Sequence, residues 1–210
     1  MRGIFVTGTD TGVGKTVVSA ALLLRYPARY WKPIQTGIET DNDTGEVRRL
    51  TGVKNDRDEG VRLPNPVSPH LAAKRAGIRI DLETLTDWPS EEAWVVEGAG
   101  GVLVPVNETQ TMANLMVRLG LPVVVVARTT LGTINHTLLT IEALRARSLL
   151  VAGVVMVGEP NPDNRAAIER YGKTGVLGEM PRFDPLTPKR LAEWARANLD
   201  PNGLFQEFFA

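Results

Sequence analysis

One segment near the start of the sequence constrains the fold more than any other. Residues 8–16 are Gly-Thr-Asp-Thr-Gly-Val-Gly-Lys-Thr, and they follow an apolar run at residues 3–6. Small residues let several backbone N–H groups turn toward one point, where the N-terminus of a following helix adds positive potential. The pattern predicts a strand, a loop that binds phosphate groups, and a helix.

Two side chains at the end of this loop suit a nucleoside triphosphate bound with Mg²⁺. Lys15 is placed to reach the β- and γ-phosphates, and the Thr16 hydroxyl is placed to bind the metal ion. Five residues separate Gly8 from Gly14, whereas the common phosphate-binding loop has four. The alternative is a glycine-rich turn without a ligand, but the strand, the spacing, Lys-Thr and the helix together favour phosphate binding.

Charge and cysteine content exclude several classes of function. The chain of 210 residues has 24 basic and 24 acidic side chains, so it lacks the basic excess that binds nucleic acid. It has no cysteine, which excludes disulfides, thiolate-bound metals and a cysteine nucleophile. The chain enters its first strand at once and has no apolar stretch of about 18 residues. We therefore expect a cytoplasmic protein with no leader, no membrane segment and no nucleic-acid partner.

Apolar runs alternate with helical patterns along the whole chain. The runs at residues 123–126 and 151–157 are continuous, as in strands covered by helices on both faces. The alternation predicts an α/β fold of the P-loop NTPase type, with a doubly wound, mostly parallel sheet and helices on both faces. The length favours a single domain, residues 1–210.

The expected elements follow from these patterns. Strands are predicted at residues 4–6, 30–34, 94–96, 122–127, 151–157 and 175–177. Helices are predicted at residues 16–24, 44–50, 69–76, 82–88, 112–119, 133–146, 165–171 and 188–198. Residues 51–66 are expected to form a long loop, and residues 203–210 an anchoring tail or an oligomer contact.

Residues that follow the predicted strands are the candidates for chemistry, since ligands of such sheets collect at the carboxyl ends of the strands. Lys32 follows the second strand, where it either stabilises negative charge or simply reaches solvent. Asp41 and Asp43 lie in the polar segment beyond it, and either carboxylate could hold Mg²⁺. Glu97 ends the third strand and precedes a glycine-rich turn, where phosphate-binding folds need a carboxylate.

A further candidate is the helix start that follows the strand at residues 122–127. The sequence there is Leu131-Gly132-Thr133-Ile134-Asn135-His136. Unpaired N–H groups at a helix start favour a carboxylate or a phosphate. A threonine-capped helix start without any ligand is the alternative.

Several motifs together match one known family. They are Gly-Thr-Asp-Thr-x-Val-Gly-Lys-Thr from Gly8, Lys-Pro-x-x-Thr-Gly from Lys32, Ser-Pro-His from Ser68, Val-Glu-Gly-Ala-Gly-Gly from Val96, Leu-Gly-x-Ile-Asn-His from Leu131, and Leu-Gly-Glu-x-Pro from Leu177. In this order and with the five-residue gap in the first motif, the chain resembles the dethiobiotin synthetases.

The resemblance implies an activity and its catalytic groups. The activity is the ATP-dependent closure of a cyclic urea on 7,8-diaminopelargonic acid with CO₂, in a homodimer. One amine captures CO₂ as a carbamate, the carbamate attacks the γ-phosphate, and the second amine displaces phosphate. By this resemblance Thr11, Lys15 and Lys32 surround the carbamate.

The resemblance also implies a set of binding residues. Mg²⁺ is held by Thr16, Asp43 and Glu97, and Thr36 contacts the diamine. The substrate carboxylate binds the partner subunit at Gly132, Thr133 and Asn135, so that the site is shared between two chains. The residues implied for ATP are Gly12, Val13, Gly14, Lys15, Thr16, Asp43, Glu97, Gly98, Ala99, Gly100, Val157, Pro181, Arg182 and Phe183.

One departure from the family pattern concerns the nucleotide base. The family often has Asn and Asp where this chain has Val157 and Gly158. Base contacts then depend on backbone groups near Val157 and on residues 181–183. We therefore predict that nucleoside triphosphates other than ATP are tolerated.

Two other classes of enzyme share a related loop. Partition-type switch ATPases have a lysine five positions before the residue equivalent to Lys15, where this chain has Asp10. Amidases of the cobyrinic acid type need a glutaminase with a cysteine nucleophile, and this chain has no cysteine. Both features favour the synthetase.

Overall fold

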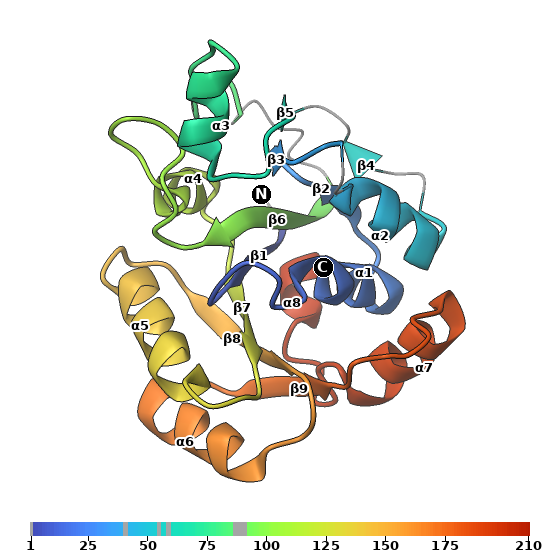
Figure 1. Ribbon diagram of the computed structural model, residues 1–210. Helices are drawn as coiled ribbons and strands as arrows, with labels where there is room; N and C mark the ends of the chain where they lie inside the picture. The colour runs from blue at the N-terminus through green and yellow to red at the C-terminus, as the bar shows by residue number, and fades with distance from the viewer. Residues whose placement is uncertain (1, 40–41, 54–55, 58–59, 86–91) are drawn as a thin grey trace.

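A parallel sheet occupies the centre of the molecule. The computed structural model describes residues 2–39, 42–53, 56–57, 60–85 and 92–210. The strands of the main sheet are β1 (Arg2–Gly8), β2 (Arg29–Trp31), β4 (Asp56–Arg57), β6 (Ala93–Gly101), β7 (Val123–Arg128), β8 (Val151–Val157) and β9 (Val176–Met180). Within the described residues they form a seven-stranded sheet of order β4-β2-β6-β1-β7-β8-β9, in which neighbouring strands pair in parallel (Figure 1).

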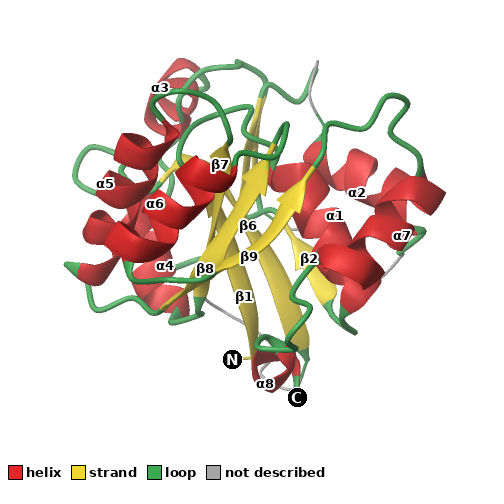
Figure 2. Ribbon diagram, turned by 90° about the horizontal axis from the view of Figure 1, so that it is seen from below, coloured by secondary structure: helices red, strands yellow, loops and turns green. Residues whose placement is uncertain are grey.

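Helices cover both faces of this sheet, as Figure 2 shows. One face carries α1 (Lys15–Arg25), α2 (Asp43–Thr51), α7 (Pro188–Asn198) and α8 (Gln206–Phe209). The other face carries α3 (Pro69–Arg75), α4 (Met112–Leu119), α5 (Thr133–Arg145) and α6 (Pro162–Gly172). The prediction of a doubly wound, mostly parallel α/β fold is confirmed.

The two hydrophobic cores follow from the alternation of side chains along each strand. In β7, Val123 and Val125 pack toward α4 and α5, whereas Val124 and Val126 pack toward α1. All four valines are fully buried. A strand that faces two helical layers must be apolar on both sides, which explains the unbroken run of valines.

The strand predicted at residues 30–34 is in fact two strands in two sheets. β2 ends at Trp31, and β3 (Ile34–Thr36) pairs in parallel with β5 (Val61–Leu63). Pro33 lies at the break and has no N–H group to donate to a ladder. The chain leaves the main sheet here, and Lys32 lies at the point of departure.

Two other local predictions are wrong. Residues 82–85 form bends and turns instead of a helix, because Asp81 accepts hydrogen bonds from Glu83 N and Thr84 Oγ1; residues 86–88 lie outside the described residues. The predicted loop at residues 51–66 contains β4 and β5, both paired with distant strands. Residues 54–55 and 58–59 of that loop are outside the described residues.

The end of the chain packs back on the start of the sheet. Phe205 and Phe209 are buried, and the ring of Phe209 stacks on Tyr26 with centroids 4.6 Å apart. The buried carboxylate of Asp200 accepts hydrogen bonds from Tyr26 Oη, Leu204 N and Phe205 N. Residues 203–210 thus anchor within the chain. No helix in the described ranges has the length and apolarity to cross a bilayer.

We predict that Phe205→Ala lowers the free energy of unfolding by about 3–5 kcal/mol, because it removes a fully buried ring. The neighbouring Leu204 is 56% exposed, so Leu204→Ala should change the free energy of unfolding by less than about 0.5 kcal/mol. Urea unfolding of both variants measures the difference. Equal losses would show that residues 203–210 do not anchor the core.

Candidate active site

The loop between β1 and α1 presents the start of a helix to the carboxyl end of the sheet. Gly14 precedes α1 with φ of 102°, and no side-chain hydrogen bond caps it. The first turn of α1 contains no acidic residue. A β-carbon on Gly14 would also lie 3.3 Å from the side chain of Val157, so only glycine suits this position. The geometry fits an anion such as a phosphate.

Side chains hold the outer half of this loop in place. Lys15 Nζ donates to the Asp10 carbonyl at 3.0 Å. The guanidinium of Arg128, at the end of β7, pairs with the Asp10 carboxylate at 3.2 Å and donates to the Thr11 carbonyl at 3.0 Å. Burial and the nearby Lys32 lower the pKa of Lys15. The loop is therefore fixed before a ligand binds.

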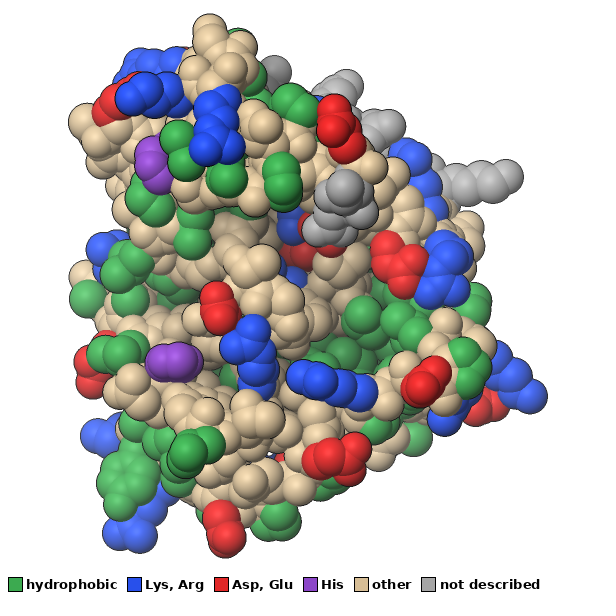
Figure 3. Space-filling model, in the orientation of Figure 1, with side chains coloured by type: hydrophobic (Ala, Val, Ile, Leu, Met, Phe, Trp, Pro, Cys, Tyr) green, Lys and Arg blue, Asp and Glu red, His purple; other side chains and the backbone are tan. Residues whose placement is uncertain are grey.

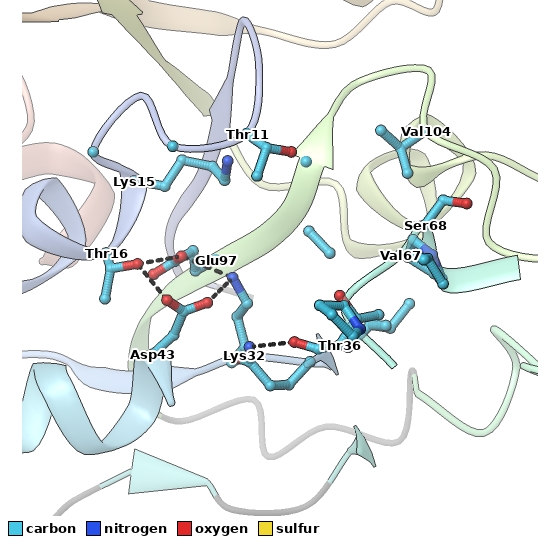
Figure 4. Close-up of a pocket in the computed structure, with 18 of the residues that line it drawn as sticks. Thr11, Lys15, Thr16, Lys32, Thr36, Asp43, Val67, Ser68, Glu97 and Val104 are labelled. Atoms are coloured by element: carbon cyan, nitrogen blue, oxygen red, sulfur yellow. Dashed lines mark hydrogen bonds and ion pairs between the residues drawn. The ribbon is translucent and has the colours of Figure 1, made fainter. Parts of the chain in front are cut away.

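A charged cluster of Thr16, Lys32, Asp43 and Glu97 lies beside the loop (Figure 4). Lys32 Nζ is 2.6 Å from Asp43 Oδ2 and 2.8 Å from Glu97 Oε1. Thr16 Oγ1 donates toward Asp43 Oδ1 at 2.6 Å and toward Glu97 Oε1 at 3.1 Å. Figure 3, in the orientation of Figure 1, shows acidic and basic side chains together in a hollow in the middle of the molecular surface.

The electrostatics of the cluster favour its charged form. Burial lowers the pKa of the Lys32 ammonium, but the Glu97 and Asp43 carboxylates outweigh it, and the pKa is raised. Burial raises the pKa of the Asp43 carboxyl, but Lys32 and Thr16 outweigh it, and the pKa is lowered. Lys32 therefore stays an ammonium and Asp43 stays a carboxylate, as an ion-paired cluster requires.

The oxygen donors of the cluster fit Mg²⁺. Hard divalent cations prefer oxygen, and Mg²⁺ commonly keeps water molecules and binds nucleotide phosphates beside one or two carboxylates. The Thr16 hydroxyl and the carboxylates of Asp43 and Glu97 supply such a set. Among the residues that the structure describes, no three His, Cys, Asp or Glu side chains gather into a larger metal cluster. Asp41, the other candidate, lies outside the described residues.

A cavity of about 580 Å³ extends from the loop and the charged cluster toward β3. Thr11 and Thr36 line it, as do Ala99 and Gly100 from β6. Eight other residues that line this cavity were not predicted from the sequence: Val17, Ile34, Gln35, Pro66, Val67, Ser68, Pro69 and Val104. Ser68 belongs to the Ser-Pro-His motif, which contributed to the family resemblance but to which no function was assigned.

A second cavity of about 360 Å³ lies on the other side of the loop. Gly12, Val13 and Gly14 line it together with Val157, Pro181, Arg182 and Phe183. The structure thus brings together the residues that were expected around the base. Of the described residues that line this cavity, none is acidic and most are apolar.

Other predicted residues lie elsewhere. Gly132, Thr133 and Asn135 line neither cavity; Thr133 is buried and donates to the Arg128 carbonyl, whereas Asn135 is exposed. Gly98 also lines neither cavity, and its carbonyl accepts from Lys32 Nζ at 3.1 Å. The predicted turn after Glu97 is wrong, since β6 continues to Gly101 with an irregular register opposite β1.

Sequence relatives identify the family. A family model described as an AAA domain matches residues 2–190. The ATP-dependent dethiobiotin synthetase BioD of Paramagnetospirillum magneticum is 52% identical over 192 residues, which is 91% of this chain and 94% of that protein. The enzyme of the same name from Sphingopyxis alaskensis is 48% identical over 200 residues, 95% of this chain and 98% of that protein. The chain belongs to the dethiobiotin synthetase family.

Two solved structures from other families have the same fold. A ParA family ATPase of Chlorobium tepidum superposes with a TM-score of 0.57 at 10% identity, covering 92% of this chain and 97% of that one. The cell division ATPase MinD of Pyrococcus furiosus gives 0.56 at 15% identity, covering 93% and 97%. This chain thus has the same fold as these two ATPases. At 10% and 15% sequence identity, the similarity concerns the fold alone.

We predict that Lys32→Met lowers the free energy of unfolding by about 3–5 kcal/mol, because two buried carboxylates lose their cation. Lys74 is exposed on α3, so Lys74→Met serves as the control and should lose less than about 0.5 kcal/mol. Denaturant unfolding without nucleotide measures both. A Lys32→Met variant as stable as the control would contradict the ion-paired cluster.

Proposed function

We propose that this chain catalyses the ATP-dependent carboxylation and ring closure of 7,8-diaminopelargonic acid with CO₂, giving dethiobiotin, ADP and phosphate. The observation that carries the proposal is the single cavity that joins the phosphate-binding loop to Lys32 and Thr36. A small substrate bound there lies beside the terminal phosphate of a nucleotide on the loop. The names of the family's enzymes support the same reaction.

The first stage is capture of CO₂. One amine of the substrate forms an N–C bond to CO₂ and loses a proton, which gives a carbamate anion. Lys15 and Lys32 are buried cations beside the space that this anion occupies, and Thr11 adds a hydroxyl donor. Such fixed donors stabilise developing charge more strongly in a sheltered site than in water.

The second stage is phosphoryl transfer. A carbamate oxygen bonds to the γ-phosphorus as the bond to the β-phosphate oxygen breaks, and ADP leaves. The N–H groups at the start of α1 and the Lys15 ammonium hold the transferring group. Thr16, Asp43 and Glu97 would hold Mg²⁺, which neutralises phosphate charge when bound.

The third stage closes the ring. The second amine attacks the carbonyl carbon of the mixed anhydride, loses a proton and releases phosphate. Because both amines belong to one molecule, the step is effectively intramolecular and depends on positioning more than on a strong base. Thr36, at the far side of the cavity from the loop, is proposed to hold the diamine.

We also propose that residues 1–210 form one domain and that the protein functions in the cytoplasm. The position of α8 near the start of β1 supports the first point, because the C-terminal helix packs on the strand at the other end of the chain. The absence of cysteine supports the second.

The test of the proposed reaction combines purified protein with the diamine, bicarbonate, Mg²⁺ and ATP. We predict a product with the mass of dethiobiotin and phosphate release that requires the diamine. The mass spectrum and a phosphate assay measure both. Phosphate release that does not depend on the diamine would support a switch ATPase instead.

We predict weak selectivity for the nucleotide base. Among the described residues, no acidic side chain lines the cavity around Val157. None of them therefore offers a carboxylate to the N–H groups of guanine, and apolar walls distinguish bases poorly. The ratio of kcat/KM for ATP to that for GTP or CTP should stay within about tenfold. Steady-state kinetics with the three nucleotides measures it, and a preference above about a hundredfold contradicts the prediction.

We propose a homodimer whose two sites are shared. Gly132, Thr133 and Asn135 lie outside the cavity of their own chain, next to Leu131, which is fully exposed. Leu103 and Leu139 are 54% and 56% exposed beside them along a groove of about 590 Å³. A second copy that covers these leucines would bring its α5 start to the substrate.

Mixing two weak variants tests the sharing. Lys15→Ala damages the loop of its own chain, with an expected loss of about a hundredfold, whereas Asn135→Ala damages the site of its partner. In an equal mixture, half of the dimers contain one intact site, so activity should recover to about a quarter of wild type. A mixture no more active than the mean of the two variants would contradict a shared site.

A further inference from the structure

Glu97 has a second buried partner that the proposed reaction does not use. Its Oε1 atom faces Lys32 and Thr16, whereas its Oε2 atom accepts a hydrogen bond from Tyr30 Oη at 2.9 Å. Both side chains are fully buried. No sequence pattern indicated this role, because Tyr30 lies in an apolar run and is typical of a core residue.

The strand next to Glu97 holds it at both oxygens. β2 runs parallel to β6, with Tyr30 opposite Val95 and Trp31 opposite Val96. Side chains alternate along a strand, so Trp31 enters one hydrophobic core and Tyr30 the other. Lys32, two residues after Tyr30, reaches the same carboxylate from beyond the strand end. Tyr30 and Lys32 therefore bind one carboxylate through different oxygens.

This arrangement leaves only the Oε1 atom of Glu97 facing the charged cluster. A buried carboxylate oxygen without a donor is costly, so the hydroxyl of Tyr30 keeps Oε2 out of the cluster. Without this hydroxyl, the carboxylate could turn both oxygens toward the Lys32 ammonium.

We propose that Tyr30 is a positioning residue that orients Glu97 so that only Oε1 faces Lys32 and the metal position. The proposal rests on the proposed function, in which Thr16, Asp43 and Glu97 hold Mg²⁺. In consequence, the Tyr30 hydroxyl sets the affinity for the metal and keeps Lys32 available to the substrate, although Tyr30 contacts neither the metal position nor the substrate.

The chain supplies a matched control in Tyr26. Its hydroxyl also donates to a buried carboxylate, that of Asp200, at the contact between α1 and the C-terminal segment. Tyr30→Phe and Tyr26→Phe each remove one oxygen and one hydrogen bond to a carboxylate. Neither Tyr26 nor Asp200 lines the cavity that holds the charged cluster.

The experiment titrates Mn²⁺ into the ADP complex of each full-length variant and follows free Mn²⁺ by electron paramagnetic resonance. Tyr30→Phe should weaken Mn²⁺ binding about tenfold, the effect typical of losing a group that orients a metal ligand. It should also lower kcat and raise the Mg²⁺ concentration needed for half-maximal rate. Tyr26→Phe should bind Mn²⁺ as wild type does.

A merely structural Tyr30 gives a different result. Both variants would then melt at lower temperature while Mn²⁺ binding and the Mg²⁺ dependence of Tyr30→Phe stay at wild-type values, and this result overturns the proposal. If Tyr30→Phe melts below the assay temperature, the titration is repeated in the cold. Failure of the wild-type protein to make dethiobiotin refutes the proposed function instead, since the Mn²⁺ titration needs no diamine.

Discussion

One buried ammonium between two carboxylates holds the candidate site together. Charges removed from water are costly unless each finds a partner, and Lys32 provides that partner for both Asp43 and Glu97. These residues come from the end of β2, the start of α2 and the middle of β6. Thr16 joins them from α1. The helix that follows the phosphate-binding loop is thereby tied to three other elements at one point.

Local sequence patterns predicted the phosphate-binding loop, the buried strand β7 and the charged residues of the cluster. The spacing of the glycines and of Lys-Thr is enough to predict the loop. The unbroken run of valines is enough to predict that β7 is buried on both faces. The clustering of Lys32, Asp43 and Glu97 also follows, because parallel strands end at the same edge of a sheet. Lys32 and Glu97 could be recognised as charged residues at the ends of apolar runs, and Asp43 as a carboxylate in the polar segment that follows the second run.

What local patterns could not predict depends on contacts between distant segments. β4 and β5 are short and become strands only through their pairing with β2 and β3. The continuation of β6 past Glu97 depends on its partner β1, which a glycine-rich sequence does not reveal. Tyr30 is the clearest case, since a tyrosine in an apolar strand looks like any core residue until the carboxylate beside it is known.

A crystal structure with Mn²⁺, a non-hydrolysable ATP analogue and the diamine tests whether the charged cluster binds the metal. Anomalous scattering locates the metal independently of the protein atoms. We predict a peak at bonding distance from Thr16 Oγ1 and from one oxygen each of Asp43 and Glu97, with Lys32 facing the diamine and the γ-phosphate. A metal bound away from these oxygens would contradict it.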